Sequence, residues 1–120
     1  MKNKIIDSIK SLQNHKKQHF LLAVSGGIDS MVMLDFFNRN SNLVDISVCH
    51  VNHNYHSDSE KMSALVSTYC NDNNIPYIES SIDSSEIKSN IEAQLREKRY
   101  LELIKVCKKV NADYVVTAHH

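Results

Sequence analysis

The two glycines of this 120-residue chain stand next to each other, at Gly26 and Gly27, one residue after a run of five apolar residues over positions 20–24. A continuous apolar run leaves no polar face, which is typical of a strand buried on both sides in a parallel sheet. Residues 28–37 follow the glycines without a linker, and their methionine, leucine and phenylalanine content favours a helix. This strand, turn and helix together indicate an α/β domain.

Strand-like and helix-like segments alternate along the rest of the chain. Apolar residues recur at helical spacing in three stretches, over residues 3–14, 62–70 and 91–107. Three other stretches have the composition and spacing of strands, over residues 44–49, 76–82 and 113–117. Strands that alternate with helices form βαβ units, which require a parallel sheet with right-handed crossovers. We therefore predict an α/β fold, with an open parallel sheet and helices on both faces, in the three-layer arrangement of Rossmann-like sandwiches.

The pattern also predicts details within these elements. Val44, Ile46 and Val48 alternate with less apolar residues, the period of two that marks a strand. The long helix is expected to begin after Asn90, with the Asn90 side chain as its cap. Along it lie the apolar residues Ile91, Leu95, Tyr100, Leu103, Ile104 and Cys107. The preceding helix is expected to form one apolar face from Met62, Leu65, Val66, Tyr69 and Cys70.

Composition limits the classes of function. The length suits one domain, and a hydrophobic fraction of 42% with a charged fraction of 23% is ordinary for a soluble globular protein. No apolar run approaches the roughly 20 residues that cross a bilayer, so no membrane association is expected. The formal net charge of zero argues against a strongly basic nucleic-acid-binding domain. Three widely spaced cysteines without a CxxC pair fit neither a disulfide framework nor a zinc site, and favour a reduced, cytoplasmic location.

The segment Ser25-Gly26-Gly27-Ile28-Asp29-Ser30 has the features of a phosphate-binding turn. Glycine allows a sharp turn and lets backbone N–H groups approach a ligand without a Cβ in the way. The helix that follows offers unpaired N–H groups and about half a positive charge at its start, which favours a phosphate group. The segment lacks the lysine of a Walker loop and the third glycine of a dinucleotide-binding motif. The alternative is a plain strand-to-helix turn in which Asp29 caps the helix.

The same six residues match SGGxDS, the signature of the PP-loop ATP pyrophosphatases, and in this segment the chain resembles that superfamily. The resemblance implies an adenine nucleotide alpha-hydrolase-like fold that cleaves ATP between its α- and β-phosphates. It implies that the loop binds the phosphates of ATP, and that the hydroxyls of Ser25 and Ser30 donate to phosphate oxygens. Asp29 is expected to help coordinate Mg²⁺ at the phosphates, because a hard carboxylate suits that ion.

Three further segments are similar to the tRNA(Ile)-lysidine synthetase family. They are His50-Val51-Asn52-His53, the stretch from Asn90 to Tyr100, and Thr117-Ala118-His119-His120. Within them, Arg99 is expected to contact the ATP phosphates and His119 to assist at the base or the α-phosphate, as catalytic residues beside Asp29. Arg96 remains the alternative to Arg99, although Glu92 can pair with Arg96 across one helical turn. Asn54-Tyr55-His56 departs from the family, which has a glycine and basic residues there.

This resemblance implies an enzyme that ligates free L-lysine to C2 of the anticodon cytidine of a tRNA(Ile) with a CAU anticodon. The reaction would use ATP and Mg²⁺ and would release pyrophosphate and AMP. Residues 1–120 would be the amino-terminal part of a PP-loop ATP-binding domain, with the rest of the catalytic domain and carboxyl-terminal domains outside this sequence. This part alone is expected to be inactive.

Other functions stay open at this point. One is a related tRNA thiolase of the 2-thiocytidine type, and another is a non-catalytic nucleotide-binding module. Metal binding by histidines is a weaker alternative, because their spacing fits no helical metal site. The histidines concerned are His15, His50, His53 and His56.

Overall fold

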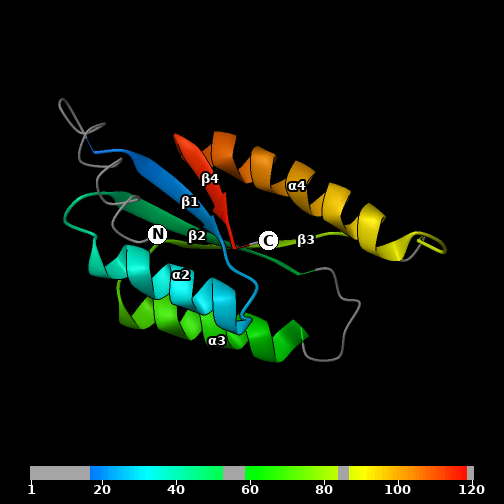
Figure 1. The fold of residues 1–120 in the computed structure, drawn as a ribbon, viewed down its shortest axis with the longest axis horizontal. Helices are drawn as coiled ribbons and strands as arrows, with labels where there is room; N and C mark the ends of the chain where they lie inside the picture. The colour runs from blue at the N-terminus through cyan, green and yellow to red at the C-terminus, as the bar shows by residue number, and fades with distance from the viewer. Residues whose placement is uncertain (1–16, 53–58, 84–86, 119–120) are drawn as a thin grey trace.

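The computed structural model describes residues 17–52, 59–83 and 87–118, and these ranges form a parallel sheet covered by helices (Figure 1). The sheet has the strand order β3-β2-β1-β4. Its strands are β1 (His19–Ala23), β2 (Asp45–Asn52), β3 (Tyr77–Ser81) and β4 (Tyr114–Thr117). Every pair of neighbouring strands is parallel, which confirms the predicted sheet. The helix expected over residues 3–14 lies outside the described residues.

Helices cover both faces of the sheet and give the expected three layers. α2 (Ile28–Arg39) and α3 (Ser59–Asp72) lie on one face, and α4 (Ile91–Val110) lies on the other (Figure 1). Successive side chains of a strand point to opposite faces, so Leu22 packs under α2 and α3 while Leu21 packs under α4. This two-sided burial explains the apolar run of β1. Within the described ranges, none of the helices combines the length and apolar character needed to cross a bilayer.

Burial in β2 does not follow the alternation seen in its sequence. Ser47, Cys49 and His50 are buried together with Ile46 and Val48. The reason is that β2 is an inner strand with helices on both of its faces, so its polar positions are covered as fully as its apolar ones.

The predicted apolar face of α3 is only partly buried. Val66 and Cys70 are in the core, whereas Met62 and Leu65 are 41% and 51% exposed. The exposed Met62 is in the first turn of α3, beside the loop that follows β1.

α4 departs from its prediction in two ways. Leu95 and Leu103 are buried, but Tyr100 and Ile104 remain exposed. Asn90 precedes the helix with a left-handed backbone (φ +49°) and makes no side-chain capping hydrogen bond, so its prediction as a side-chain cap was wrong.

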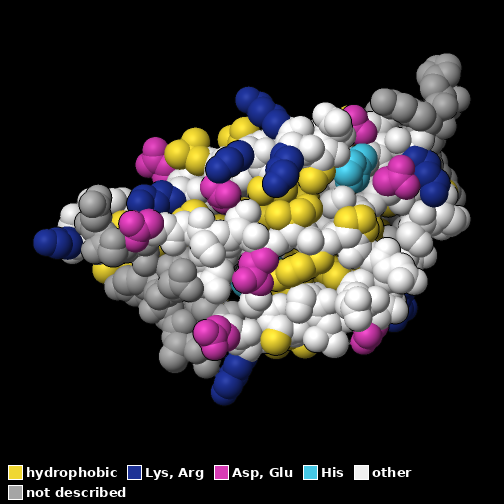
Figure 2. Space-filling view, turned by 180° about the vertical axis from the view of Figure 1, so that it is seen from behind, with side chains coloured by type: hydrophobic (Ala, Val, Ile, Leu, Met, Phe, Trp, Pro, Cys, Tyr) yellow, Lys and Arg dark blue, Asp and Glu magenta, His cyan; other side chains and the backbone are white. Residues whose placement is uncertain are grey.

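Figure 2 shows one face of the molecule, where hydrophobic side chains lie at the surface between charged side chains of both signs.

The chain reverses direction across the sheet at β1. From β1 it passes through α2 to β2 and on to β3 at one edge, and then returns through α4 to β4 on the other side of β1. In open parallel sheets, ligands bind beyond the carboxyl ends of the strands at such a reversal. Residues 24–30, which follow β1, therefore lie where a ligand crevice is expected.

Candidate nucleotide-binding site

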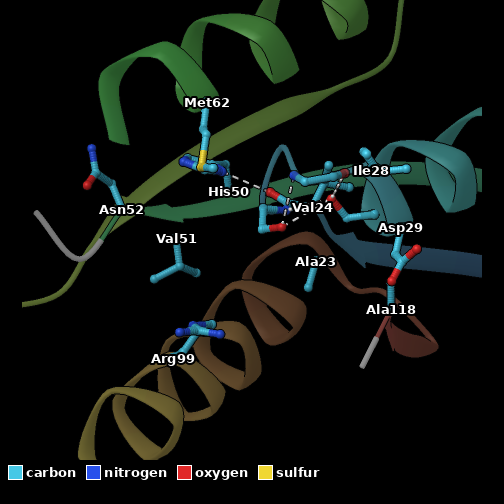
Figure 3. A pocket seen from close by; sticks show the side chains of 13 residues that line it. Ala23, Val24, Ile28, Asp29, His50, Val51, Asn52, Met62, Arg99 and Ala118 are labelled. Atoms are coloured by element: carbon cyan, nitrogen blue, oxygen red, sulfur yellow. Dashed lines mark hydrogen bonds between the residues drawn. The ribbon is translucent and has the colours of Figure 1, made fainter. Parts of the chain in front are cut away.

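A cavity of about 640 Å³ opens at the carboxyl ends of the strands (Figure 3). Its volume lies within the roughly 300–1,000 Å³ that is usual for small-molecule sites. Most of the predicted phosphate loop lines it, namely Ser25, Gly27, Ile28, Asp29 and Ser30. The opposite walls come from the end of β2, the first turn of α3, the middle of α4 and Ala118 after β4. Side chains from distant parts of the sequence thus converge on one concave site.

Gly26 brings the loop into direct contact with α3. Its φ of +95° lies in the left-handed region that favours glycine. A Cβ at this position would lie 2.9 Å from the Cβ of Met62 and 3.2 Å from its Cα. Gly27 has no such requirement, because its φ is −72° and an added Cβ would meet only the Oγ of Ser25, at 3.5 Å. The first glycine is therefore the one that the loop conformation requires.

The loop is held together by its two serines. The amides of Ser25 and Gly26 donate to Oγ of Ser30 over 3.2 and 3.1 Å, and the amide of Gly27 donates to Oγ of Ser25 over 3.2 Å. Oγ of Ser30 in turn donates to the carbonyl of Gly27 over 3.0 Å, and the Ser30 side chain is buried. These three amides therefore bond within the loop, and do not all point to an anion as the sequence suggested. Phosphate donation by the serine hydroxyls stays a prediction.

The start of α2 lies at the cavity. The first turn of an α-helix has no intrahelical acceptor for its amides, and the first turn of α2, which begins at Ile28, lines the cavity. The amide of Met31 bonds to the carbonyl of Gly27 over 3.0 Å. Together with the helix dipole, this turn is the part of the loop best placed to hold an anion.

Arg99 faces this turn from the other side of the cavity. It lies on α4, on the opposite face of the sheet from α2, and Figure 3 shows its guanidinium beneath Val51. Arg96 is exposed and does not line the cavity. Of the two candidate arginines, the structure thus brings Arg99 to the site. His119 and His53 lie outside the described residues, so their predicted places are not tested.

A polar row crosses from the cavity to β3. His50 is buried, and its Nδ1 lies 2.8 Å from the carbonyl oxygen of Val24. In the register of the sheet, the residue of β3 opposite His50 is Glu79. The Glu79 carboxylate accepts hydrogen bonds from Ser63 and Tyr77. These bonds hold the pKa of the Glu79 carboxyl below its ordinary value, with a smaller contribution from His50. Burial raises the pKa of Tyr77 to about 12. Glu79 thus remains a carboxylate at neutral pH.

Asp29 is the residue expected from the sequence to help coordinate Mg²⁺, and its role stays a prediction. The described residues contain no group of three or more histidine, cysteine, aspartate or glutamate side chains that could hold an ion. Magnesium is usually bound through one or two carboxylates together with substrate phosphates. Asp29 is a carboxylate of this kind, since it lines the cavity in the first turn of α2 and reaches toward Ala118 (Figure 3).

Met62 is a cavity residue that sequence reasoning did not identify. Its spacing placed it on the apolar face of α3, yet it is partly exposed and lines the cavity beside the loop. The glycine pair indicates that some part of the chain packs closely against the loop. The sequence does not identify that part as Met62. Asn52, at the end of β2, was found as part of a motif and also lines the cavity.

The structure has a parallel sheet between two layers of helices, and a glycine turn joins β1, where the strand order reverses, to a helix. This arrangement is typical of the α/β domains that bind phosphate groups beyond the carboxyl ends of their strands. Within this class, the chain belongs to the PP-loop domain family, whose family model matches residues 1–120.

Curated relatives narrow the similarity further. The chain is 41% identical over 103 residues to a tRNA(Ile)-lysidine synthase of Mesoplasma florum, covering 84% of this chain and 26% of the relative. It is 39% identical over 100 residues to a tRNA(Ile)-lysidine synthase of Mycoplasmopsis pulmonis, covering 83% and 34%. The chain thus spans about a quarter to a third of these relatives. The predicted resemblance to lysidine synthetases is confirmed as sequence similarity.

A solved structure confirms the fold. The U34-tRNA thiolase NcsA from Methanococcus maripaludis, described with its [4Fe-4S] cluster, superposes with a TM-score of 0.83. The match covers 99% of this chain and 44% of the thiolase, at 16% sequence identity. This likeness in fold agrees with the predicted adenine nucleotide alpha-hydrolase-like fold.

Proposed function

We propose that this chain is the amino-terminal part of the ATP-binding domain of a tRNA(Ile)-lysidine synthetase. In this proposal, the remainder of the catalytic domain follows His120. The observation that carries it is the cavity at the carboxyl ends of β1 and β2, in which the SGGxDS loop faces Arg99. The similarity to relatives named tRNA(Ile)-lysidine synthase supports the choice of reaction.

The proposed reaction has two steps. The C2 carbonyl oxygen of the anticodon cytidine attacks the α-phosphorus of ATP, the bond between the α-phosphorus and the β-phosphate oxygen breaks, and pyrophosphate leaves. The amino group of lysine then attacks C2, a C–N bond forms, AMP leaves and the amine loses a proton. The task of this chain is to hold the triphosphate and to neutralise the departing pyrophosphate. The positive end of the α2 dipole and the guanidinium of Arg99 are the groups proposed for that task.

Magnesium would add positive charge at the phosphates, and Asp29 is the proposed carboxylate beside it. His119 is proposed to assist at the base or the α-phosphate. Most of the residues that bind tRNA are proposed to lie outside this chain. The net charge of the chain is zero, and the face shown in Figure 2 carries both positive and negative side chains.

The reaction can be tested directly with the full-length protein. ATP labelled at the α-phosphate is incubated with labelled lysine and a tRNA(Ile) transcript that has a CAU anticodon. We expect AMP formation that requires the tRNA, and lysine incorporation into the tRNA. A transcript whose anticodon cytidine is replaced by uridine is the control and should give neither product. Lysine that stays free while AMP accumulates with the correct tRNA would contradict the proposal.

Two cysteines of the described residues are not placed to serve a thiolase reaction. Cys49 and Cys70 are buried, and burial raises the pKa of each thiol to about 11. A thiol acts as a nucleophile or metal ligand through its thiolate, so these two are not placed for sulfur transfer.

The two arginines of α4 provide a matched pair of variants, because each replacement by alanine removes one positive charge from the same helix. Arg99→Ala is expected to weaken binding of a non-hydrolysable ATP analogue about tenfold or more, since charge-assisted hydrogen bonds are among the stronger ones. Arg96→Ala is expected to change the affinity less than about twofold. Calorimetric titration of both variants tests this. A larger loss for Arg96→Ala would assign the phosphate contact to Arg96.

A further inference from the structure

The ladder between β1 and β2 ends at the cavity, which Ala23 and Val24 line. Its last paired residues are Ala23 and Cys49, and its last bond runs from the amide of Val24 to the carbonyl of Cys49, over 3.0 Å. A regular parallel ladder would next take the amide of Val51 to the carbonyl of Val24. In the structure, the Val24 carbonyl is met by Nδ1 of His50, at 2.8 Å. A side chain of β2 thus takes the position of a strand amide.

The chemistry of the acceptor fixes the tautomer of His50. A carbonyl oxygen accepts hydrogen bonds and cannot donate them, so Nδ1 must hold the proton. The His50 side chain is only 4% exposed, and a buried carbonyl without a partner would be costly. The remaining ring nitrogen, Nε2, belongs to a side chain that lines the cavity beside Met62 (Figure 3).

We propose that His50 is a positioning residue that sets the separation of β1 and β2 at the mouth of the nucleotide site. Its imidazole holds the Val24 carbonyl a side chain's width from the backbone of β2. The strands therefore part at this level, and Val24 and Val51 become walls of the cavity. The loop is then held at two points, at Val24 by β2 and at Gly26 by α3.

This inference rests on the proposed function only in that the cavity is taken to hold ATP. Two amide replacements separate the nitrogens of the ring. The amide nitrogen of asparagine reaches about as far as Nδ1 of histidine, and that of glutamine about as far as Nε2. His50→Asn can therefore keep the bond to Val24, whereas His50→Gln cannot keep it without displacing the strands.

Binding of an ATP analogue whose α,β-bridging oxygen is replaced by carbon is measured by calorimetry on both variants of the full-length protein. We expect His50→Asn to bind within about threefold of the original protein, and His50→Gln to bind about tenfold more weakly or worse. The reverse order would overturn the inference, because it would make Nε2 a direct contact of the nucleotide. Equal losses, or equal retention, would also overturn it, since the two ring nitrogens would then not differ.

A measurement on the unsubstituted protein keeps the inference testable if a variant does not fold. Imidazole ¹⁵N–¹H correlation spectra without nucleotide identify the protonated ring nitrogen of His50. The Nδ1–H tautomer is expected, and an Nε2–H tautomer would overturn the proposal. This result is independent of the proposed function, which fails separately if the unsubstituted protein does not bind the analogue.

Discussion

Replacing Gly26 with alanine is expected to destabilise the domain by about 2–4 kcal/mol and to weaken ATP binding by at least about tenfold. Alanine at φ +95° is strained, and its Cβ would lie 2.9 Å from the Cβ of Met62. The close atoms of Met62 include its Cα and its carbonyl oxygen, each at 3.2 Å, so rotation of a flexible side chain cannot relieve the contact. The loop or the first turn of α3 must move. Urea unfolding and titration with an ATP analogue measure the two effects.

Gly27→Ala is the matched control for the unfolding experiment. Gly27 has a φ of −72°, which any residue adopts, and an added Cβ would make an ordinary contact of 3.5 Å with Ser25. Its effect on stability should stay below about 1 kcal/mol. A second comparison tests the cause of the strain. Met62→Ala retains the Cβ and the backbone at residue 62, so it should not rescue Gly26→Ala. Equal unfolding midpoints for the two glycine variants would contradict the role assigned to Gly26.

The sheet and its layers could be predicted because the signals are local and strong. The apolar run of β1 has no polar face, and a strand of that kind must be covered on both sides. The helices repeat with a period different from that of the strands, and their alternation leaves few possible topologies. The boundaries of β1 and β2 shifted by only a few residues between prediction and structure. The positions of the strands and the layered topology therefore follow from the sequence without knowledge of distant contacts.

Burial within a helix could not be predicted with the same success, because it depends on the neighbours of that helix. Met62 and Val66 share the apolar face of α3, yet only Val66 lies over the core. The first turn of α3 lies against the loop that follows β1, which it meets at Gly26. A sequence period gives the direction in which a side chain points. It does not show how much of the helix packs against the sheet.

The site was predicted in its location and only partly in its contacts. A signature motif named the residues of the loop, but a serine hydroxyl can bond to a ligand or to its own backbone, and the sequence does not decide between these partners. In the structure, Ser30 bonds within the loop. The choice between Arg96 and Arg99 had the same origin. Residues three apart on a helix point in neighbouring directions, and the packing of α4 against the sheet decides which arginine reaches the cavity.

Replacing Asp29 with asparagine is expected to lower kcat for AMP formation by a factor on the order of 10²–10³. Asp29 lies in the first turn of α2 and lines the cavity, where a carboxylate can complete the coordination of magnesium carried by the phosphates. The amide keeps the size of the side chain and removes its charge. The loss of a favourable charge near a helix start should cost only about 0.3–1 kcal/mol of stability, so the variant should remain folded.

The dependence on magnesium distinguishes this role from a purely structural one. The Asp29→Asn variant should need a higher magnesium concentration for half-maximal activity. The ion is proposed to be held by the ATP phosphates and by the Asp29 carboxylate, and the substitution removes the charge of the carboxylate. Asp72→Asn is the control, since Asp72 is an exposed aspartate at the far end of α3 and does not line the cavity. It should match the unsubstituted protein in kcat and in magnesium dependence. An unchanged magnesium dependence in a folded Asp29→Asn protein would remove Asp29 from the proposed metal site, whatever its kcat.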